Sequence, residues 1–168
     1  RSAWGTAFAH AGIGLSIIGI AAQAWSTEAI TVLKPGERLT SGRYTIVLEA
    51  ISPRTGPNFR AEVARFQVFS GDRELMPVEA SKRVYTARSM PTTEAGIRTD
   101  GLSQAYVSLG EAQDGGVAVR LYDKPLILLI WIGSLVMALG GGLSLTDRRF
   151  RLAAPKRAAP AVAVQPAE

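Results

Sequence analysis

The chain has 168 residues, a hydrophobic fraction of 47%, a mean hydropathy of +0.14 and a formal net charge of +5. This length accommodates one domain of ordinary size, and the apolar fraction is high for a protein without membrane segments. Because there are no cysteines, disulfides, thiolate metal sites, cysteine nucleophiles and thioether attachment within this chain are excluded.

The first apolar segment covers residues 2–27 and contains one ionisable side chain, His10, which is the only histidine of the chain. Trp4 and Trp25 bracket the segment, and along a helix they would lie ~32 Å apart, which suits the two interfacial belts of a membrane. We therefore predict a transmembrane helix over residues 1–25. A signal peptide is the alternative, because an arginine precedes the run and an A-x-A-like site follows it, although signal peptides have apolar cores of only ~7–15 residues.

A rotation of 100° per residue divides this helix into three faces. One face is bulky and suits lipid tails, and it carries Trp4, Phe8, Leu15 and Ile18. A second face has small residues that predict a closely packed neighbouring helix, namely Gly5, Ala9, Gly12, Ser16, Gly19 and Gln23. His10 lies on the third face, where Gly14, one turn away, leaves space beside the imidazole for another helix or for a flat cofactor.

An ionisable residue inside a membrane helix indicates a functional site. The alternative is an imidazole that only packs helices together through a hydrogen bond, and the residues alone leave both interpretations open. Among functions, haem ligation suits a neutral imidazole in an apolar helix bundle. A proton relay would need nearby carboxylates, and zinc would need further ligands.

Residues 26–124 lack long apolar runs and predict a small β domain. Their 13 Lys/Arg and 12 Asp/Glu nearly balance. Alternation of apolar and polar residues, separated by Gly- and Asp-containing turns, predicts strands over residues 43–51, 61–69, 82–88, 104–110 and 116–122. Consecutive strands without helical spacers favour an antiparallel sandwich or a partly open barrel.

The second apolar stretch runs from Pro125 to Leu145, and its 21 residues would span ~30 Å as a helix. We predict a transmembrane helix over residues 125–146. Three consecutive glycines, residues 140–142, require close packing to compensate for their weak helix propensity. The small-residue face and the His10 face of the first helix also need neighbours. Together with the glycines they predict further membrane helices outside this chain, and the first residue is then expected to be an end cut from a longer protein.

Most of the positive excess lies in the tail, residues 147–168, directly after the second span. This placement fits the positive-inside rule of membrane proteins, and it argues against nucleic-acid binding. With two spans, both ends of the chain are expected in the cytoplasm and the β domain on the extracytoplasmic side. The Ala-, Pro- and Val-rich tail is expected to be disordered.

The motifs of the chain, in this order, resemble the C-terminal part of CcmF, the large membrane subunit of the haem lyase in System I cytochrome c maturation. The resemblance covers nearly the whole chain up to the tail, and the motifs that carry it are WGTAFAHAGIGLSIIG (4–19), GPNF (56–59), KRVY (82–85), MPTTEAGI (90–97), AYVSLGE (105–111) and VRLYDKPLILLIWIGSLVMALGGGLSLTDRRFR (119–151).

This resemblance implies that His10 is an axial ligand of a b-type haem, with no other metal role. The second axial ligand and the tryptophan-rich WWD segment belong to earlier helices that this sequence does not contain. The resemblance further implies a bacterial inner-membrane protein with its β domain in the periplasm. The implied partners are the rest of the haem lyase subunit, other cytochrome c maturation subunits, the haem chaperone CcmE, apocytochrome c and a quinol as electron donor.

The β domain itself offers no recognisable catalytic site. We expect Glu94 and Glu111 to be solvated surface residues and Met90 to be an ordinary core or loop methionine rather than a haem ligand. The segment Met90–Ile97 is expected to be a loop that contacts partner subunits or the apocytochrome. Rival interpretations are a non-catalytic scaffold, in which a membrane-anchored β domain recruits partners and His10 only packs helices, and a transporter subunit.

Overall fold

The computed structural model describes residues 2–87, 90–113 and 115–146. An α-helix, α1 (Ser2–Ala21), continues into a short 3-10 helix, η1 (Ala22–Trp25), and a second α-helix, α2 (Leu128–Leu145), follows the β domain. Between the helices lie nine strands: β1 (Thr27–Leu33), β2 (Arg38–Ser41), β3 (Tyr44–Thr55), β4 (Phe59–Ser70), β5 (Arg73–Tyr85), β6 (Pro91–Glu94), β7 (Gly96–Asp100), β8 (Ser103–Gln113) and β9 (Gly116–Lys124).

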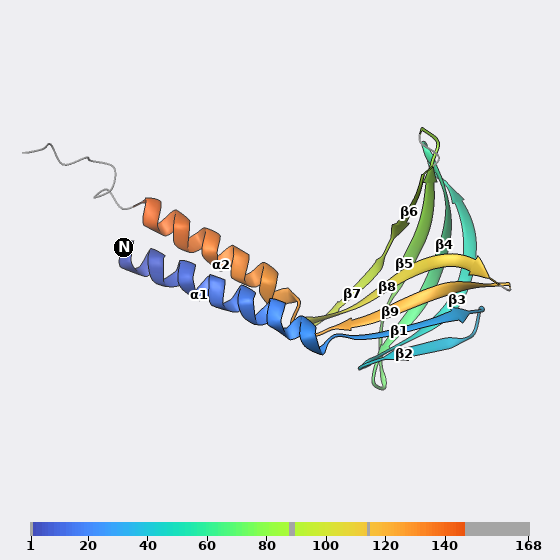
Figure 1. The fold of residues 1–168 in the computed structure, drawn as a ribbon, viewed down its shortest axis with the longest axis horizontal. Helices are drawn as coiled ribbons and strands as arrows, with labels where there is room; N and C mark the ends of the chain where they lie inside the picture. Colours follow the sequence, from blue (N-terminus) through green and yellow to red (C-terminus); the bar gives the residue numbers. More distant parts are fainter. Residues whose placement is uncertain (1, 88–89, 114, 147–168) are drawn as a thin grey trace, which may run out of the picture.

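The strands form two antiparallel sheets that pack face to face (Figure 1). One sheet has the order β1-β9-β8-β7 and the other the order β2-β3-β4-β5-β6. Inward-facing side chains of both sheets form one apolar core, whose largest fully buried members are Tyr44, Phe66, Ile46, Leu48, Leu121, Val68, Val107 and Val119. The predicted fold class is therefore confirmed: two apolar helices flank an antiparallel β-sandwich.

The segment Met90–Ile97 is not a loop, so that part of the prediction is wrong, while its contact with partners stays a prediction. Residues 91–94 form β6 at the edge of one sheet, and residues 96–100 form β7 at the edge of the other. Pro91 is tolerated because an edge strand does not need every N–H. Gly96 lets the chain cross between the sheets, since a Cβ there would lie 2.8 Å from the backbone oxygen of Glu79.

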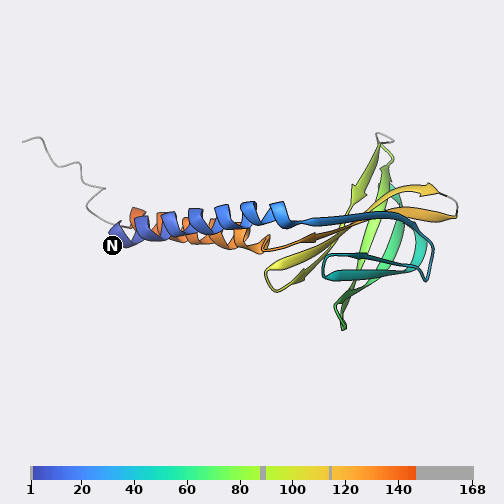
Figure 2. The ribbon, with the colours of Figure 1, turned by 60° about the horizontal axis from the view of Figure 1, so that its bottom comes forward.

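The two helices lie side by side along their length and extend away from one end of the sandwich (Figures 1 and 2). A Cβ on Gly12 would lie 2.5 Å from the carbonyl oxygen of Gly133, and one on Gly5 would lie 2.7 Å from that of Gly140. The prediction that the small-residue face of α1 meets a neighbouring helix is thus confirmed, and the neighbour is α2. By length and composition, both helices could cross a membrane.

Residues 147–168, for which a basic and disordered cytoplasmic tail was predicted, lie outside the described residues. The triple glycine at residues 140–142 falls within α2 and is only partly explained by the helix pair. Gly140 is buried against α1, whereas a Cβ on Gly141 or Gly142 would meet nothing within 4 Å. These two positions present a flat backbone surface away from α1.

Candidate functional site

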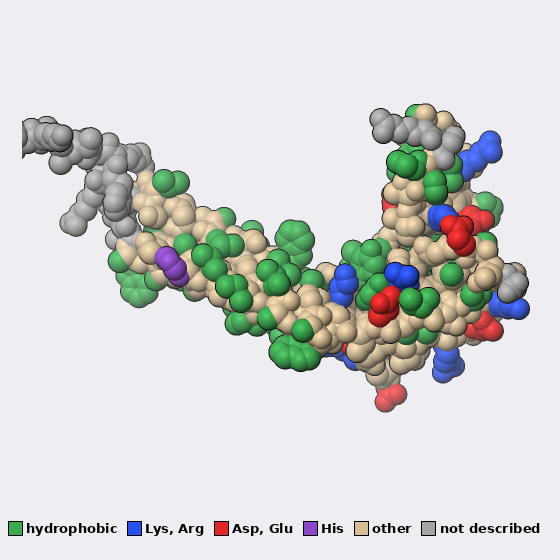
Figure 3. Space-filling model, in the orientation of Figure 1, with side chains coloured by type: hydrophobic (Ala, Val, Ile, Leu, Met, Phe, Trp, Pro, Cys, Tyr) green, Lys and Arg blue, Asp and Glu red, His purple; other side chains and the backbone are tan. Residues whose placement is uncertain are grey.

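His10 lies near the end of the helix pair that is far from the sandwich, and its side chain is exposed (Figure 3). Its Nδ1 lies 2.8 Å from the carbonyl oxygen of Thr6, one turn earlier. A carbonyl oxygen can only accept, so Nδ1 carries the proton and donates it, and in the neutral ring the lone pair is then on Nε2. Within the described part of the chain, Nε2 has no hydrogen-bond partner.

The imidazole faces away from α2. His10 is two residues from Gly12, which puts the two side-chain directions roughly 160° apart around the helix, and Gly12 is the residue that packs against α2. Gly14, on the His10 side, would have nothing within 4 Å of an added Cβ. The space that the sequence predicts beside the imidazole is present, and no part of the described chain fills it.

The hydrogen bond of His10 is therefore internal to α1 and does not hold the two described helices together. Their polar link is instead Ser16, whose hydroxyl donates to the carbonyl oxygen of Ile130 at 3.3 Å. The described residues include no group of three or more His, Cys, Asp or Glu side chains that could hold a metal ion. The donor set at this position is a single imidazole nitrogen, which can provide one ligand to a metal ion or to the metal of a cofactor.

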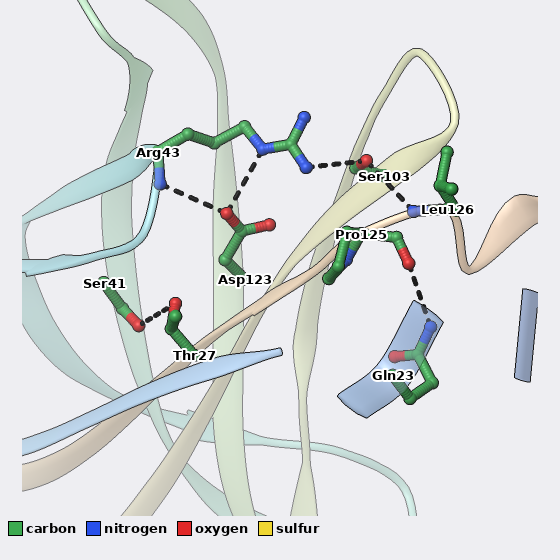
Figure 4. A network of polar contacts seen from close by, with 8 residues as sticks. All are labelled: Gln23, Thr27, Ser41, Arg43, Ser103, Asp123, Pro125 and Leu126. Atoms are coloured by element: carbon green, nitrogen blue, oxygen red, sulfur yellow. Dashed lines mark hydrogen bonds and ion pairs between the residues drawn. The ribbon is translucent and has the colours of Figure 1, made fainter. Parts of the chain in front are cut away.

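A second polar cluster joins the helices to the sandwich (Figure 4). Gln23, in η1, donates from Nε2 to the carbonyl oxygen of Pro125 at 2.9 Å and to that of Gly19 at 3.0 Å. It thereby ties the end of the first helical segment to the start of the second. Leu126 follows with a φ of +52°, a conformation that is rare for a residue with a Cβ.

The same junction reaches into both sheets. Asp123, nearly buried at the end of β9, accepts from the backbone N–H of Arg43 at 3.1 Å and from its Nε at 3.2 Å. Arg43 also donates to the Ser103 hydroxyl at 2.8 Å, and this hydroxyl accepts the N–H of Leu126 at 3.3 Å. A chain of hydrogen bonds thus connects the turn between β2 and β3 to the start of α2 (Figure 4).

The polar residues singled out in the sandwich lie apart from His10 and from the junction. Glu94 forms an ion pair with Arg83 at 2.6 Å, and Glu111 forms one with Lys82. Both carboxylates lie at the surface, and the side chain of Met90 is 58% exposed. The arrangement of these described residues does not suggest catalysis. The junction residues were not predicted from the sequence, because their contacts join segments that are distant along the chain.

Comparison with known proteins decides the family. A sequence model described as the CcmF C-terminal beta-sandwich matches residues 24–125. The chain belongs to the CcmF family. The sequence resemblance is therefore confirmed, and the CcmF region matched is the one that contains every strand of the sandwich.

Curated CcmF relatives extend the similarity to nearly the whole chain. The cytochrome c-type biogenesis protein CycK of Rhizobium meliloti (strain 1021) is 51% identical over 166 residues, which are 98% of this chain and 25% of the relative. The cytochrome c-type biogenesis protein CcmF of Escherichia coli (strain K12) is 38% identical over 162 residues, 95% of this chain and 25% of the relative. The chain thus spans about a quarter of the length of these relatives.

A solved structure of the cytochrome c heme lyase CcmF has the same fold. The two superimpose with a TM-score of 0.72 over 85% of this chain and 24% of that chain, at 16% sequence identity. At this identity the similarity supports the arrangement of helices and sandwich, and no residue roles are transferred from it.

Proposed function

We propose that this chain is the C-terminal membrane portion of a cytochrome c haem lyase subunit and that His10 is an axial ligand of a b-type haem. The observation that carries the proposal is the state of the imidazole: Nδ1 donates to the Thr6 carbonyl oxygen, and Nε2 points away from α2 without a partner among the described residues. Histidines that bind metals usually donate their other ring N–H in this way, which fixes the ring and raises its basicity.

The surroundings of the imidazole support a planar ligand. Gly14 and Ala7, each within about one turn of His10 on the same side of α1, carry the smallest side chains. A macrocycle can therefore approach the backbone of α1 on this side while α2 covers the other. When bound, the haem would supply a redox-active iron whose potential depends on its axial ligands and on the polarity around it.

One imidazole provides one axial position, so a second ligand must come from outside this chain. The chain spans about a quarter of its curated relatives, which leaves room for further helices in the rest of such a protein. The open surface at Gly141 and Gly142 of α2 is a second position where another helix can pack closely.

The proposed topology places both helices, within residues 1–25 and 125–146, in the bacterial inner membrane. The sandwich, within residues 26–124, then lies in the periplasm, and the basic tail, residues 147–168, lies in the cytoplasm. In this position the sandwich would face the proposed periplasmic partners, the haem chaperone CcmE and apocytochrome c, together with other maturation subunits. A quinol in the membrane would be the electron source for the resident haem.

The test uses the full-length subunit, purified with its haem, as wild type and as His10→Ala, His10→Met and Thr6→Ala. We expect His10→Ala to lose the b-type haem spectrum. His10→Met, which keeps a possible ligand, should shift the α-band and the reduction potential. Thr6→Ala is the matched control, because it changes a side chain on the same face and keeps the carbonyl oxygen that holds Nδ1.

Equal haem content and equal spectra in wild type and His10→Ala would contradict the ligand assignment. That result, with membrane insertion intact, would favour the rival interpretation, a membrane-anchored scaffold in which His10 packs against another helix. Loss of cytochrome c maturation in the His10→Ala strain, with normal levels of the protein, would connect the ligand to the process that the relatives' names describe.

A further inference from the structure

Two tyrosines and a lysine form a compact group on the outer face of the sheet that leads into α2. Tyr106 on β8 and Tyr122 on β9 are direct partners in the strand register, and their ring centroids lie 5.8 Å apart in an edge-on arrangement. The Nζ of Lys124 lies 4.4 Å from the ring centroid of Tyr106 and 5.5 Å from that of Tyr122. Both rings therefore hold the ammonium group by cation–π attraction.

Lys124 differs in one respect from the neighbouring cation on this face. Arg120 pairs with Glu28 at 3.2 Å, whereas Lys124 has no carboxylate partner among the described residues. Lys124 is half-buried as a residue, the two rings hold its ammonium group in place, and no described carboxylate neutralises the charge. A site of this kind attracts an anion from outside the chain.

The position of Lys124 relative to α2 indicates which kind of anion it meets. Lys124 is four residues before the start of α2, so its Cα lies within ~14 Å of that of Leu128. The 18 residues of α2 span ~27 Å, close to the thickness of the hydrocarbon core, which places Leu128 at the edge of that core. Lys124 is then at the level of the phospholipid headgroups.

Other residues at this end of the sandwich have the composition of a membrane interface. Trp25 is 73% exposed just before β1, whose first residue pairs with Asp123 next to Lys124. Leu102, in the turn between β7 and β8, is 40% exposed, and its carbonyl oxygen accepts the N–H of Leu128. Figure 3 shows apolar, basic and acidic side chains together where the sandwich meets the helix pair. Exposed Trp, Tyr and Lys are typical of interfacial belts.

We propose that this surface, made of Tyr106, Tyr122 and Lys124, binds the phosphate of an anionic phospholipid headgroup at the outer leaflet. Lys124 provides the charge, and the tyrosine rings form the surface on which the headgroup rests. Charge complementarity and continuity with the membrane span favour a lipid over a protein partner. The proposal rests on the membrane placement of α1 and α2 proposed above, and it does not depend on haem binding by His10.

The experiment reconstitutes the full-length protein into mixed phosphatidylcholine and phosphatidylglycerol, extracts it mildly and measures by mass spectrometry the phosphatidylglycerol that remains bound. We expect enrichment over the bulk lipid in wild type and about a fivefold loss of enrichment in Lys124→Gln, the effect of one basic residue near an anionic surface. Lys34→Gln is the matched control, because Lys34 is an exposed lysine that follows the other end of β1.

Equal enrichment in wild type and Lys124→Gln overturns the lipid site, and so does an equal loss in Lys34→Gln, which would mean that net charge alone attracts the lipid. Displacement of the lipid by inorganic phosphate at equal ionic strength would show a free-phosphate site and also overturn it. The haem spectrum of Lys124→Gln is expected to match wild type. Failure of the wild-type protein to enter the bilayer would instead contradict the membrane placement itself.

Discussion

Tyr44 is fully buried in the sandwich, yet its hydroxyl has no hydrogen-bond partner among the described residues. Burial raises the pKa of this phenol above its ordinary value of 10.0, the Arg43 guanidinium opposes the shift, and the carboxylates of Asp100 and Asp123 add to it. An unpaired buried hydroxyl costs about 1–3 kcal/mol. The ring of Tyr44 therefore stabilises the core, while its unpaired hydroxyl lowers the free energy of unfolding.

We expect Tyr44→Phe to raise the free energy of unfolding by about 1 kcal/mol at neutral pH, because it removes the unpaired hydroxyl and keeps the ring. The direction in which the stability of wild type changes at high pH follows from the raised pKa of Tyr44. The unfolded phenol ionises from about pH 10 while the folded one resists, so wild type loses stability as the pH rises through the folded pKa, and Tyr44→Phe does not. Urea unfolding followed by circular dichroism at neutral pH and above pH 10 measures both effects.

Tyr85→Phe provides the control, since Tyr85 is a half-buried tyrosine that packs against Phe59. Its stability is expected to stay within about 0.5 kcal/mol of wild type at neutral pH. A loss of stability in Tyr44→Phe would show that its hydroxyl has a stabilising partner.

At His10 the sequence was informative because helical geometry is local. A rotation of 100° per residue places the imidazole opposite the glycine face, and the structure has the same arrangement. The sequence could not identify Asp123 or Ser103 as junction residues. Their partners are 80 and 60 residues away along the chain, and only the packed sandwich brings them together.

Among the elements, the helix pair depends on glycine. Each of Gly5, Gly12 and Gly19 faces α2 at a distance that excludes a side chain, and Gly133 and Gly140 face α1 in the same way. In a membrane, such contacts between backbones provide much of the packing energy, because lipid tails are as apolar as leucine.

Gly12→Leu should separate the helices near their middle, because a Cβ at this position already lies 2.6 Å from the backbone nitrogen of Met137. The spacing is expected to increase toward the ~8–10 Å that larger side chains impose. The chain has no cysteines, so spin labels on cysteines placed at Ile13 and Leu135, both exposed, measure the separation specifically.

Gly14→Leu is the matched control, because it makes the same substitution on the open side of the same helix. Its label separation is expected to equal that of wild type. An equal increase in both variants would mean that leucine at either position disturbs α1 itself, and no increase in Gly12→Leu would contradict the glycine contact.

Some strands could be located from the sequence and others could not, and the difference lies in how their residues are buried. The strands β3, β4, β8 and β9 alternate buried and less buried residues over part of their length, so the alternation of apolar and polar residues located them. β1 exposes most of its residues and β2 has four, which leaves little pattern to detect. The first part of β5 contains Pro77, usually a strand breaker, and Pro77 lies where the register with β4 shifts and no ladder hydrogen bond is required.

At the scale of the whole molecule, the junction decides how the sandwich is held against the helix pair. Only residues 26 and 125–127 separate the helical segments from β1 and β9, and hydrogen bonds occupy this short stretch. Gly42, with a φ of +55°, lets the turn between β2 and β3 approach Asp123, because an added Cβ would lie 2.5 Å from the carboxylate. Asp123 thus lies at the centre of the contacts between β9 and the turn that carries Arg43, and Arg43 in turn reaches Ser103 beside the start of α2.

Asp123→Ala removes the acceptor of two hydrogen bonds from Arg43, one of them an ion pair. We expect the free energy of unfolding to fall by about 2 kcal/mol. We also expect the distance between spin labels at Leu135, on α2, and Met76, on β5, to become more broadly distributed. Both label positions are exposed.

Glu49→Ala is the comparison that separates this junction from an ordinary surface pair. Glu49 and Arg65 also form an ion pair, at 2.9 Å, but both side chains are more than 40% exposed, and such pairs contribute about 0–1 kcal/mol. Glu49→Ala should therefore leave the label distribution unchanged. If Asp123→Ala lowers stability and the distribution stays narrow, the carboxylate holds the sandwich together without orienting it. The other junction contacts, Gln23 to Pro125 and the backbone bond from Leu128 to Leu102, then fix the two parts.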